Sequence, residues 1–291
     1  MSANRYENHI LKNATPLRDF FITLWNLFLY GGFIPALWGP SLLVTSSVFM
    51  GIPCQPVTAA ISFMLPLTVY AYDYLADLED DAATNPERCG FISRWGMKLT
   101  VTYLLLLIAL LICCMNIWMI ILSAAMFVTG ILYAGLFKGL TERITGFKNI
   151  YLGLIWSSWA VTPLFIQNQC FPWPSSLAVF IFIFLKVYIN TAFSDYKDIE
   201  SDSLRGLRTL PVVYGERKSL KVLQIINGVN AAILLSGIFL AGIPLAASPA
   251  VVLCLYTALY LHFKESMGTE NATLVADLEG PLHLLLLLAV V

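Results

Sequence analysis

Long stretches of this chain carry no formally charged side chain. The longest is Phe20–Tyr72, and Val101–Phe137, Asn149–Leu185 and Val222–Phe263 are of the same kind. A helix needs only about 20 apolar residues to cross a bilayer. Each stretch is long enough to cross twice, so each predicts two membrane-spanning helices joined by a turn.

The turns are expected where proline, glycine and polar residues gather: near Pro53–Pro56, near Cys114–Asn116, at Gln167–Pro174 and at Gly242–Pro249. Four such hairpins give eight spans. A weaker ninth follows, although Gly280-Pro281 interrupts it. The expected limits are 20–46, 55–80, 98–114, 117–137, 149–167, 175–200, 219–241, 248–265 and 274–291.

One alternative divides the first span at Gly31-Gly32 or at Pro40. It is disfavoured because the resulting pieces are too short to cross. It would also disturb the alternation of charged and uncharged connections along the chain. One bent helix is therefore expected there.

Composition agrees with a membrane protein. The 291 residues are 58% hydrophobic and 12% charged, with a mean hydropathy of +0.77. A soluble domain carries about 25% charged residues. The expected fold is an all-α polytopic bundle of nine transmembrane helices in a single domain, 1–291. A net charge of −1 gives no overall attraction to nucleic acid, and nothing in the sequence implies a protein partner.

Charge is distributed unevenly between the two ends of the predicted bundle. The four turns contain no Lys, Arg, Asp or Glu, whereas the connections at the opposite end contain nearly all of them. Because loops rich in Lys and Arg stay in the cytoplasm, this pattern predicts a cytoplasmic N-terminus and a cytoplasmic charged end.

The second predicted span ends in a cluster of acids. Asp73, Asp77 and Asp81 are spaced i, i+4, i+8, so they share one helix face. Like charges at this spacing destabilise a helix, and the negative end of the helix dipole adds to the cost. The arrangement is unfavourable unless a cation binds there, although a merely solvated helix end is the simpler explanation of one cluster alone.

A second cluster ends the sixth predicted span. Asp198 and Asp202 repeat the i, i+4 spacing, and Asp195 lies one turn earlier. The separation along the chain is the same from Asp77 to Asp198 as from Asp81 to Asp202. Both clusters end spans that run in the same direction, so two related halves, 17–148 and 149–291, are expected to share one mouth.

Basic residues accompany both clusters: Arg88 follows the first, and Lys197 and Arg205 flank the second. Mg²⁺ prefers a few carboxylates together with waters and phosphate oxygens. Arginine can bind the remaining phosphate oxygens bidentately. Carboxylates and cations together therefore favour a magnesium–diphosphate ligand.

Polar residues at membrane depth are further candidates for a cavity. Lys186 and Asn190 continue the i, i+4 series that leads to Asp198. A buried lysine is costly and usually functional, although its side chain can also snorkel to an interface. Asn26 and Tyr133 could line the same cavity or join two spans by hydrogen bonds.

The acidic clusters resemble the two motifs of the UbiA superfamily of intramembrane prenyltransferases. The first motif of that family, N-D-x-x-D-x-x-x-D and then N-P-x-R-P, corresponds to DYLADLEDD (73–81) and NPERC (85–89). The second, D-x-x-D-x-x-x-D and then R-x-x-T-L-P-V, corresponds to DYKDIESD (195–202) and RGLRTLPV (205–212).

The sequence departs from these motifs at four positions. Asp73 and Tyr74 replace the leading Asn and Asp of the first motif, Cys89 replaces its closing Pro, and Ser201 replaces a Gly in the second. The superfamily assignment is unaffected, whereas the subfamily is left open.

The resemblance implies a helical bundle with a central cavity that binds a polyprenyl diphosphate through two Mg²⁺ ions. Asp77 and Asp81 would hold one ion, and Asp198 and Asp202 the other. Asp73 and Asp195 would assist. Phosphate-binding roles are implied for Arg18, Asn85, Arg88, Lys148, Lys197 and Arg205.

The expected function is Mg²⁺-dependent transfer of a prenyl group from its diphosphate to a lipophilic acceptor. The acceptor could be an aromatic quinone precursor, a glycerol-phosphate ether lipid or a carotenoid. Aromatic rings can stabilise an allylic cation by about 0.5–2 kcal/mol each. The candidates for this role are Tyr70, Tyr72, Tyr74 and Tyr188.

Two alternatives remain open. A terpene cyclase on the same scaffold would release diphosphate without an acceptor. A divalent-cation transporter would use the acidic faces as a pore mouth, but it would need polar residues through to the outer turns.

Overall fold

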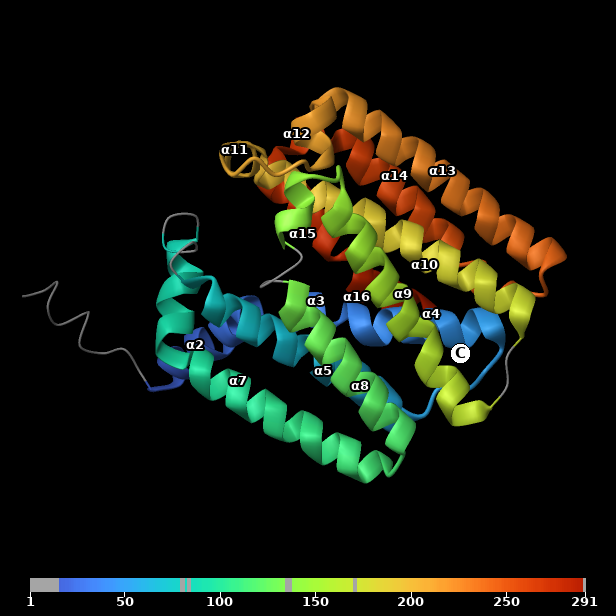
Figure 1. Cartoon of the computed structure of the whole chain (residues 1–291), viewed down its shortest axis with the longest axis horizontal. Helices are drawn as coiled ribbons and strands as arrows, with labels where there is room; N and C mark the ends of the chain where they lie inside the picture. Colours follow the sequence, from blue (N-terminus) through green and yellow to red (C-terminus); the bar gives the residue numbers. More distant parts are fainter. Residues whose placement is uncertain (1–15, 79–81, 83–84, 134–137, 170–171, 290–291) are drawn as a thin grey trace, which may run out of the picture.

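The computed structural model describes residues 16–78, 82, 85–133, 138–169 and 172–289, and all regular secondary structure among them is helical. The α-helices and 3₁₀-helices (η) succeed one another along the chain, and the long ones pack side by side (Figure 1). The elements of the first half are α2 (Pro16–Tyr30), α3 (Phe33–Ala36), α4 (Trp38–Met50), α5 (Pro56–Ala76), α7 (Pro86–Cys114), α8 (Ile117–Leu132) and η3 (Lys138–Glu142). The elements of the second half are α9 (Phe147–Asn168), α10 (Trp173–Ser194), η4 (Asp195–Lys197), α11 (Ile199–Leu204), α12 (Leu210–Tyr214), α13 (Glu216–Leu240), η5 (Leu245–Ala247), α14 (Ala250–Met267), α15 (Thr269–Asp277) and α16 (Glu279–Leu288).

Seven helical segments of the described chain are long and apolar enough to cross a membrane. The predicted all-α polytopic class is therefore confirmed, whereas the predicted count of nine is not. Two predicted spans are absent from the seven: α8 is apolar but shorter, and α5 is long enough without being among them. The seven segments are Phe33–Met50, Pro86–Cys114, Phe147–Asn168, Trp173–Lys197, Glu216–Leu240, Leu245–Met267 and Asn271–Leu288.

The predicted turns between paired helices are present where the structure describes their residues, which excludes 170 and 171. After α4, Gly51 adopts a left-handed conformation with φ 64°, and Pro56 begins α5. Between α7 and α8, the side chain of Asn116 accepts hydrogen bonds from the backbone of Trp118 and Met119 at 3.0 and 3.3 Å. Such side-chain capping satisfies N–H groups that have no partner within the helix.

The first predicted span differs from the expectation of one bent helix. Helix α2 ends at Tyr30, and Gly32 adopts φ 85°, a left-handed value that breaks the helix before α3. Glycine reaches this conformation at little cost because it lacks a Cβ. The membrane-length segment therefore begins at Phe33, and α2 is a separate helix with several exposed aromatic side chains.

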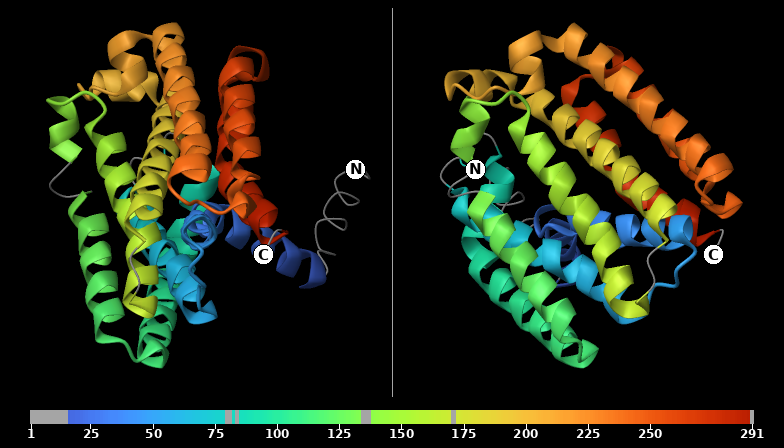
Figure 2. Two further views of the ribbon diagram at one scale, coloured as in Figure 1. Left: turned by 90° about the vertical axis from the view of Figure 1, so that its right-hand side faces the viewer. Right: turned by 45° about the vertical axis from the view of Figure 1, so that its right-hand side comes forward.

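The centre of the bundle is formed by α4, α9, α10 and α16. Figures 1 and 2 show α10 running beside α9 and α13, with α14 beyond. The rings of Phe49 on α4 and Phe182 on α10 lie 5.2 Å apart and are both almost fully buried. Helices α4 and α5 touch at Gly39, where a Cβ atom would lie 1.8 Å from the carbonyl oxygen of Ser62. A larger residue at 39 would therefore force these helices apart.

A cap of short elements covers the charged end of the bundle. The segment after α11 hydrogen-bonds to the segment before α9: the Arg208 N–H donates to the Thr141 carbonyl at 2.9 Å, and the Gly146 N–H donates to the Arg208 carbonyl at 2.9 Å. These bonds join the two halves of the chain at the level of the acidic clusters.

Candidate active site

A cavity of about 460 Å³ opens at this charged end, and both acidic clusters contribute to its wall. The first cluster supplies Asp73 and Asp77, and the second supplies Asp198 and Asp202. Four basic side chains line the same cavity: Arg88, Lys148, Lys197 and Arg205. The expected shared mouth is thus formed from four separate parts of the sequence.

The first cluster lies at the end of α5. Asp73 belongs to the last turn of the helix, and Asp77 ends it, with its N–H donating to the Asp73 carbonyl at 2.9 Å. Both side chains are half-buried. Asp81, predicted as a ligand in the same cluster, lies outside the described residues.

The second cluster begins directly after the last residue of α10, Ser194. Asp195 and Lys197 form η4, Asp198 precedes α11, and Asp202 lies within α11. The Asp202 N–H donates to the Asp198 carbonyl at 2.7 Å, so these two acids lie one helical turn apart. Both line the cavity.

Asp195 has a different environment from its neighbours. Its side chain is fully buried, and Lys148 Nζ lies 2.8 Å from one carboxylate oxygen. The side-chain amide of Asn149 donates to the other oxygen at 3.0 Å. Asp195 does not line the cavity; it holds Lys148, which does.

Asn85 and Arg88 define the start of α7. The side chain of Asn85 caps the helix by accepting from the Arg88 N–H at 3.2 Å. The Arg88 guanidinium lies 4.7 Å from the centroid of the Tyr74 ring, within the range of a cation–π contact. Asn85 therefore orients the helix that presents Arg88, but it does not line the cavity itself.

Below the charged mouth the cavity becomes apolar and aromatic. Tyr133 and Tyr151 stack with ring centroids 5.3 Å apart, and both line the wall. An amphiphile with an anionic head and a hydrocarbon tail matches this gradient. The deeper lining residues are Leu65, Pro66, Val69, Tyr70, Met126, Leu152, Ile155, Trp156 and Trp159.

The Asp202 side chain has a buried carboxylate oxygen without a hydrogen-bond donor. Burial, followed by the charges of Asp195 and Asp198, raises its pKa to about 6 from 3.8, while Lys148 opposes the shift. Its Oδ2 atom is buried and makes no hydrogen bond. A buried oxygen without a donor is costly, and a cation bound there would remove the cost.

The described residues contain no ready-made metal cluster of three Asp, Glu, His or Cys side chains. Mg²⁺ binds through one or two carboxylates and completes its shell with water and phosphate oxygens, and the mouth offers carboxylates in two pairs. The donor set at the mouth therefore fits a metal that arrives with an anionic ligand.

Three predicted site residues lie away from the cavity. Arg18 is exposed on α2, and Tyr72 is 38% exposed and does not contribute to the wall. Asn26 lines a second, open cleft between α2 and the start of α7, which also includes Arg94 and Trp95.

Lys186 and Asn190 also lie outside the cavity lining. Lys186 forms a buried ion pair with Glu279, and the Asn190 side chain donates to the Ala276 carbonyl at 3.0 Å. The i, i+4 spacing placed both on one stripe of α10, but that stripe turns toward the C-terminal helices at this depth.

Tyr151 and Trp156 were not among the predicted cavity residues, although both contribute to the wall. Each lies within an uncharged span, where one aromatic residue is difficult to distinguish from another by sequence alone. On α9, Tyr151 is at i+3 and Leu152 at i+4 from Lys148, and Trp156 is at i+4 from Leu152. These positions share one helix face, so the spacing from Lys148 could have indicated Tyr151 and Trp156 as cavity residues.

The fold and the cavity define a class: a membrane-embedded helical enzyme with an acidic and basic mouth above an apolar pocket. The UbiA prenyltransferase family matches this chain over residues 86–279, and the chain belongs to that family. The predicted superfamily is thereby confirmed, and the activity class is prenyl transfer.

Solved structures show the same fold. A UbiA homologue from Aeropyrum pernix K1 in its apo form aligns with a TM-score of 0.66 and 16% identity, over 87% of this chain and 98% of that chain. A UbiA homologue from Archaeoglobus fulgidus bound to GPP and Mg²⁺ aligns with a TM-score of 0.60 and 20% identity, over 90% of this chain and 98% of that chain. A digeranylgeranylglyceryl phosphate synthase aligns with a TM-score of 0.55 and 19% identity, over 93% of this chain and 96% of that chain. A search of curated proteins found no significant match.

Proposed function

We propose that this protein transfers a polyprenyl group from its diphosphate to a lipophilic acceptor in the membrane, with Mg²⁺ as cofactor. The convergence of two acidic clusters and four basic side chains on one cavity with an apolar interior carries the proposal. The Archaeoglobus homologue that shares the fold was solved with GPP and Mg²⁺, which supports the same class of donor here.

Magnesium would be held by Asp77 on one side of the mouth and by Asp198 and Asp202 on the other, and we propose two ions. Asp73 stands one turn before Asp77 and would assist, and Asp81 would complete the first set. When bound, magnesium neutralises the charge that develops on the departing diphosphate.

The chain itself would bind and orient the diphosphate. Arg88 and Arg205 can each offer paired N–H donors to phosphate oxygens. Lys148, fixed by its ion pair with Asp195 at 2.8 Å, would present its remaining N–H donors at a defined position. Lys197 adds a fourth cation at the rim.

The prenyl chain would lie in the apolar part of the cavity. Tyr70, Tyr133 and Tyr151 line the wall between the acids and the apolar interior. Departure of the diphosphate breaks the C1–O bond and leaves an allylic cation, which ring faces stabilise. The acceptor nucleophile then forms the new bond to C1 and loses its proton.

The acceptor is proposed only as a class. An aromatic quinone precursor, a glycerol-phosphate ether lipid and a carotenoid all satisfy the requirement for a lipophilic nucleophile. The shared fold with a digeranylgeranylglyceryl phosphate synthase supports including the ether lipid in the first assay. We propose a multi-pass protein whose N-terminus and cavity mouth face the cytoplasm, built as one domain from two related halves.

Diphosphate release from geranylgeranyl diphosphate tests the proposal. Purified protein would be assayed with Mg²⁺, with and without each acceptor class, beside Asp77→Asn and Asp198→Asn. Release that requires an acceptor and is lost in both variants supports the transferase. Release without acceptor indicates the cyclase instead. Absence of release, together with Mg²⁺ flux in liposomes, would favour a transporter.

A further inference from the structure

The last two helices meet at a bend beside the second acidic cluster. Helix α15 ends at Asp277, and α16 begins at Glu279. Pro281 has no N–H, so it cannot donate to the Asp277 carbonyl as the next turn of a continuous helix would. Carbonyl groups at such a break must find other donors when they lie at membrane depth.

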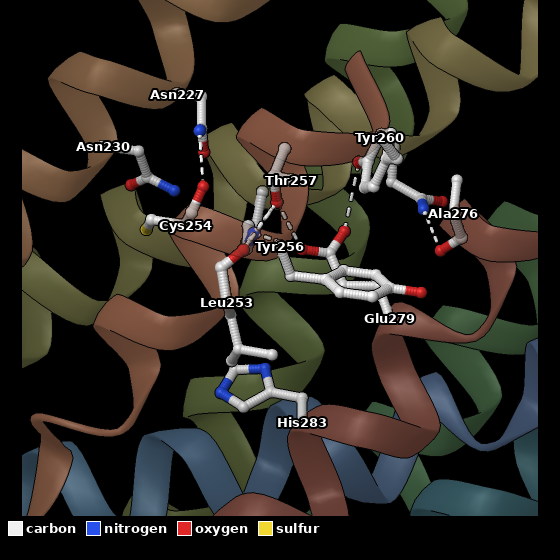
Figure 3. A network of polar contacts seen from close by, with 12 residues as sticks. Asn227, Asn230, Leu253, Cys254, Tyr256, Thr257, Tyr260, Ala276, Glu279 and His283 are labelled. Atoms are coloured by element: carbon white, nitrogen blue, oxygen red, sulfur yellow. Dashed lines mark hydrogen bonds and ion pairs between the residues drawn. The ribbon is translucent and has the colours of Figure 1, made fainter. Parts of the chain in front are cut away.

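Side chains from two neighbouring helices converge on this bend (Figure 3). Asn190 on α10 donates to the Ala276 carbonyl at 3.0 Å, and Tyr256 on α14 donates to the Val275 carbonyl at 2.6 Å. The Glu279 carboxylate receives the Lys186 ammonium and the hydroxyl groups of Thr257 and Tyr260. Five contacts thus hold the five-residue segment 275–279.

The contact of Lys186 with Glu279 joins two opposite charges. Each side chain is only 1% exposed. A charge without a partner at this depth would be very unfavourable, so the pair specifies one arrangement of α10 against α16. Asn227 and Asn230 on α13 form separate hydrogen bonds, to the carbonyls of Cys254 and Phe182 at 2.8 and 3.1 Å.

Helix α16 is also held from its other side. A Cβ atom on Gly280 would lie 2.7 Å from the indole nitrogen of Trp38 on α4. His283 lies 3.2 Å from the Thr45 hydroxyl, also on α4. The bend therefore has little freedom to shift toward α4 or away from α10.

The bend borders the cavity mouth. Helix α15 packs against η4, the element that carries Lys197. Asp277 is the middle residue of the segment held by the five contacts, and it lies close enough to Lys197 and Tyr70 for its charge to act on both, without an ion pair to Lys197 within 4 Å. Both of these residues line the cavity. A shift of the bend would therefore move the Asp277 carboxylate relative to η4, which carries Lys197.

We propose that Lys186 and Glu279 are positioning residues for the diphosphate site: they fix the bend at 275–279 and thereby hold Asp277 where it orients Lys197. The inference rests on the proposed function for its substrate, and it assigns a role to a buried cluster that does not touch the cavity. Lys197 would contact the diphosphate, on which negative charge grows as the C1–O bond breaks.

Replacing both charges tests this without leaving one of them unpaired. A buried ion pair can be replaced by apolar residues of similar volume with little loss of stability, so Lys186→Met/Glu279→Met is expected to fold. Its KM for geranylgeranyl diphosphate should rise about tenfold, as expected for one displaced charge-assisted contact. Its kcat should fall as well, because the displaced ammonium would also stabilise the charge that grows on the leaving diphosphate.

Three further variants separate positioning from general stability. Asp277→Asn should reproduce the rise in KM, and the exchanged pair Lys186→Glu/Glu279→Lys should return it toward the wild-type value. Asn230→Ala removes a buried hydrogen bond between α13 and α10 and should leave KM unchanged. Lys197→Ala should add little in the Lys186→Met/Glu279→Met background, because coupled residues are not additive.

Hydrogen exchange provides a readout that needs no substrate. Residues 269–281 and 195–205 should exchange faster in Lys186→Met/Glu279→Met than in wild type or Asn230→Ala. Unchanged exchange there, a wild-type KM in Asp277→Asn, or additive effects with Lys197→Ala would each overturn the inference. If wild type transfers no prenyl group, the proposed function fails, and exchange still decides whether the pair fixes the bend.

Discussion

Lys148 and Asp195 are 47 residues apart in the sequence, and their side chains meet at 2.8 Å beside the cavity. Because Asn149 binds the second oxygen of Asp195 at 3.0 Å, both oxygens of this carboxylate have partners within the chain. Asp195 therefore differs from Asp198 and Asp202, which line the cavity. The first acid of the second motif orients a cation, and the later two are available to a metal.

This pair leads to an unequal effect of two substitutions. Lys148→Met should destabilise the protein by about 3–5 kcal/mol, because it leaves the fully buried Asp195 charge without its cation. Asp195→Asn should cost only about 1–3 kcal/mol, because the Lys148 side chain is 33% exposed and can reach water. Denaturation midpoints in detergent measure both, and the opposite order would contradict the assignment.

The carboxylates at the mouth should be needed for catalysis and not for folding. Asp77→Asn and Asp198→Asn should each lower kcat by about 10²–10³-fold, the usual cost of removing a preorganised electrostatic group. Thermal midpoints should stay near that of wild type. Glu265→Gln is the matched control, because Glu265 is exposed and paired only with Arg217 at 3.7 Å. Equal activity in all three variants would disprove the assignment.

Asp202 should make the metal-free protein sensitive to pH. Its pKa is raised to about 6 from 3.8, so the folded state binds this proton more tightly than the unfolded state. Stability should therefore decrease as the pH rises through this interval. The thermal midpoint in chelator, measured from pH 4.5 to 7, should fall more in wild type than in Asp202→Asn. Parallel curves would show that Asp202 is not the group responsible.

Two glycines allow a paired test of packing. Gly39→Ala would place a Cβ atom 1.8 Å from the Ser62 carbonyl oxygen, so it should destabilise the protein by about 1–3 kcal/mol. Gly90→Ala meets nothing within 4 Å in α7 and should stabilise it by about 0.5–1 kcal/mol. Chemical denaturation of both variants gives the comparison, and similar effects would contradict the close contact of α4 with α5.

Much of the architecture could be predicted from where charge is absent. Uncharged length and turn residues located the hairpins, because a bilayer fixes the length of a span. The expectation of one bent helix in the first span was wrong, since a length rule does not detect a left-handed glycine such as Gly32, at φ 85°. Asp77 and Asp198 were predicted to reach one mouth because the two clusters have the same spacing and end spans that run in the same direction.

The partners of buried polar residues were harder to predict. Periodicity identifies which residues share a stripe of α10, but it does not tell which neighbouring helix the stripe faces. Lys186 was expected in the cavity for this reason, whereas its partner Glu279 lies 93 residues later. The same limit applies to Asp195, whose role depends on the first turn of α9.

The balance of charges around the cavity has a consequence for assembly. Among the described residues, four carboxylates and four cationic side chains form its wall. The mouth thus supplies counter-ions for most of its own charges, so the bundle can close around it with little net charge. The proposed substrate, a prenyl diphosphate carrying magnesium, is itself close to neutral. Its entry would therefore add little net charge at the membrane surface.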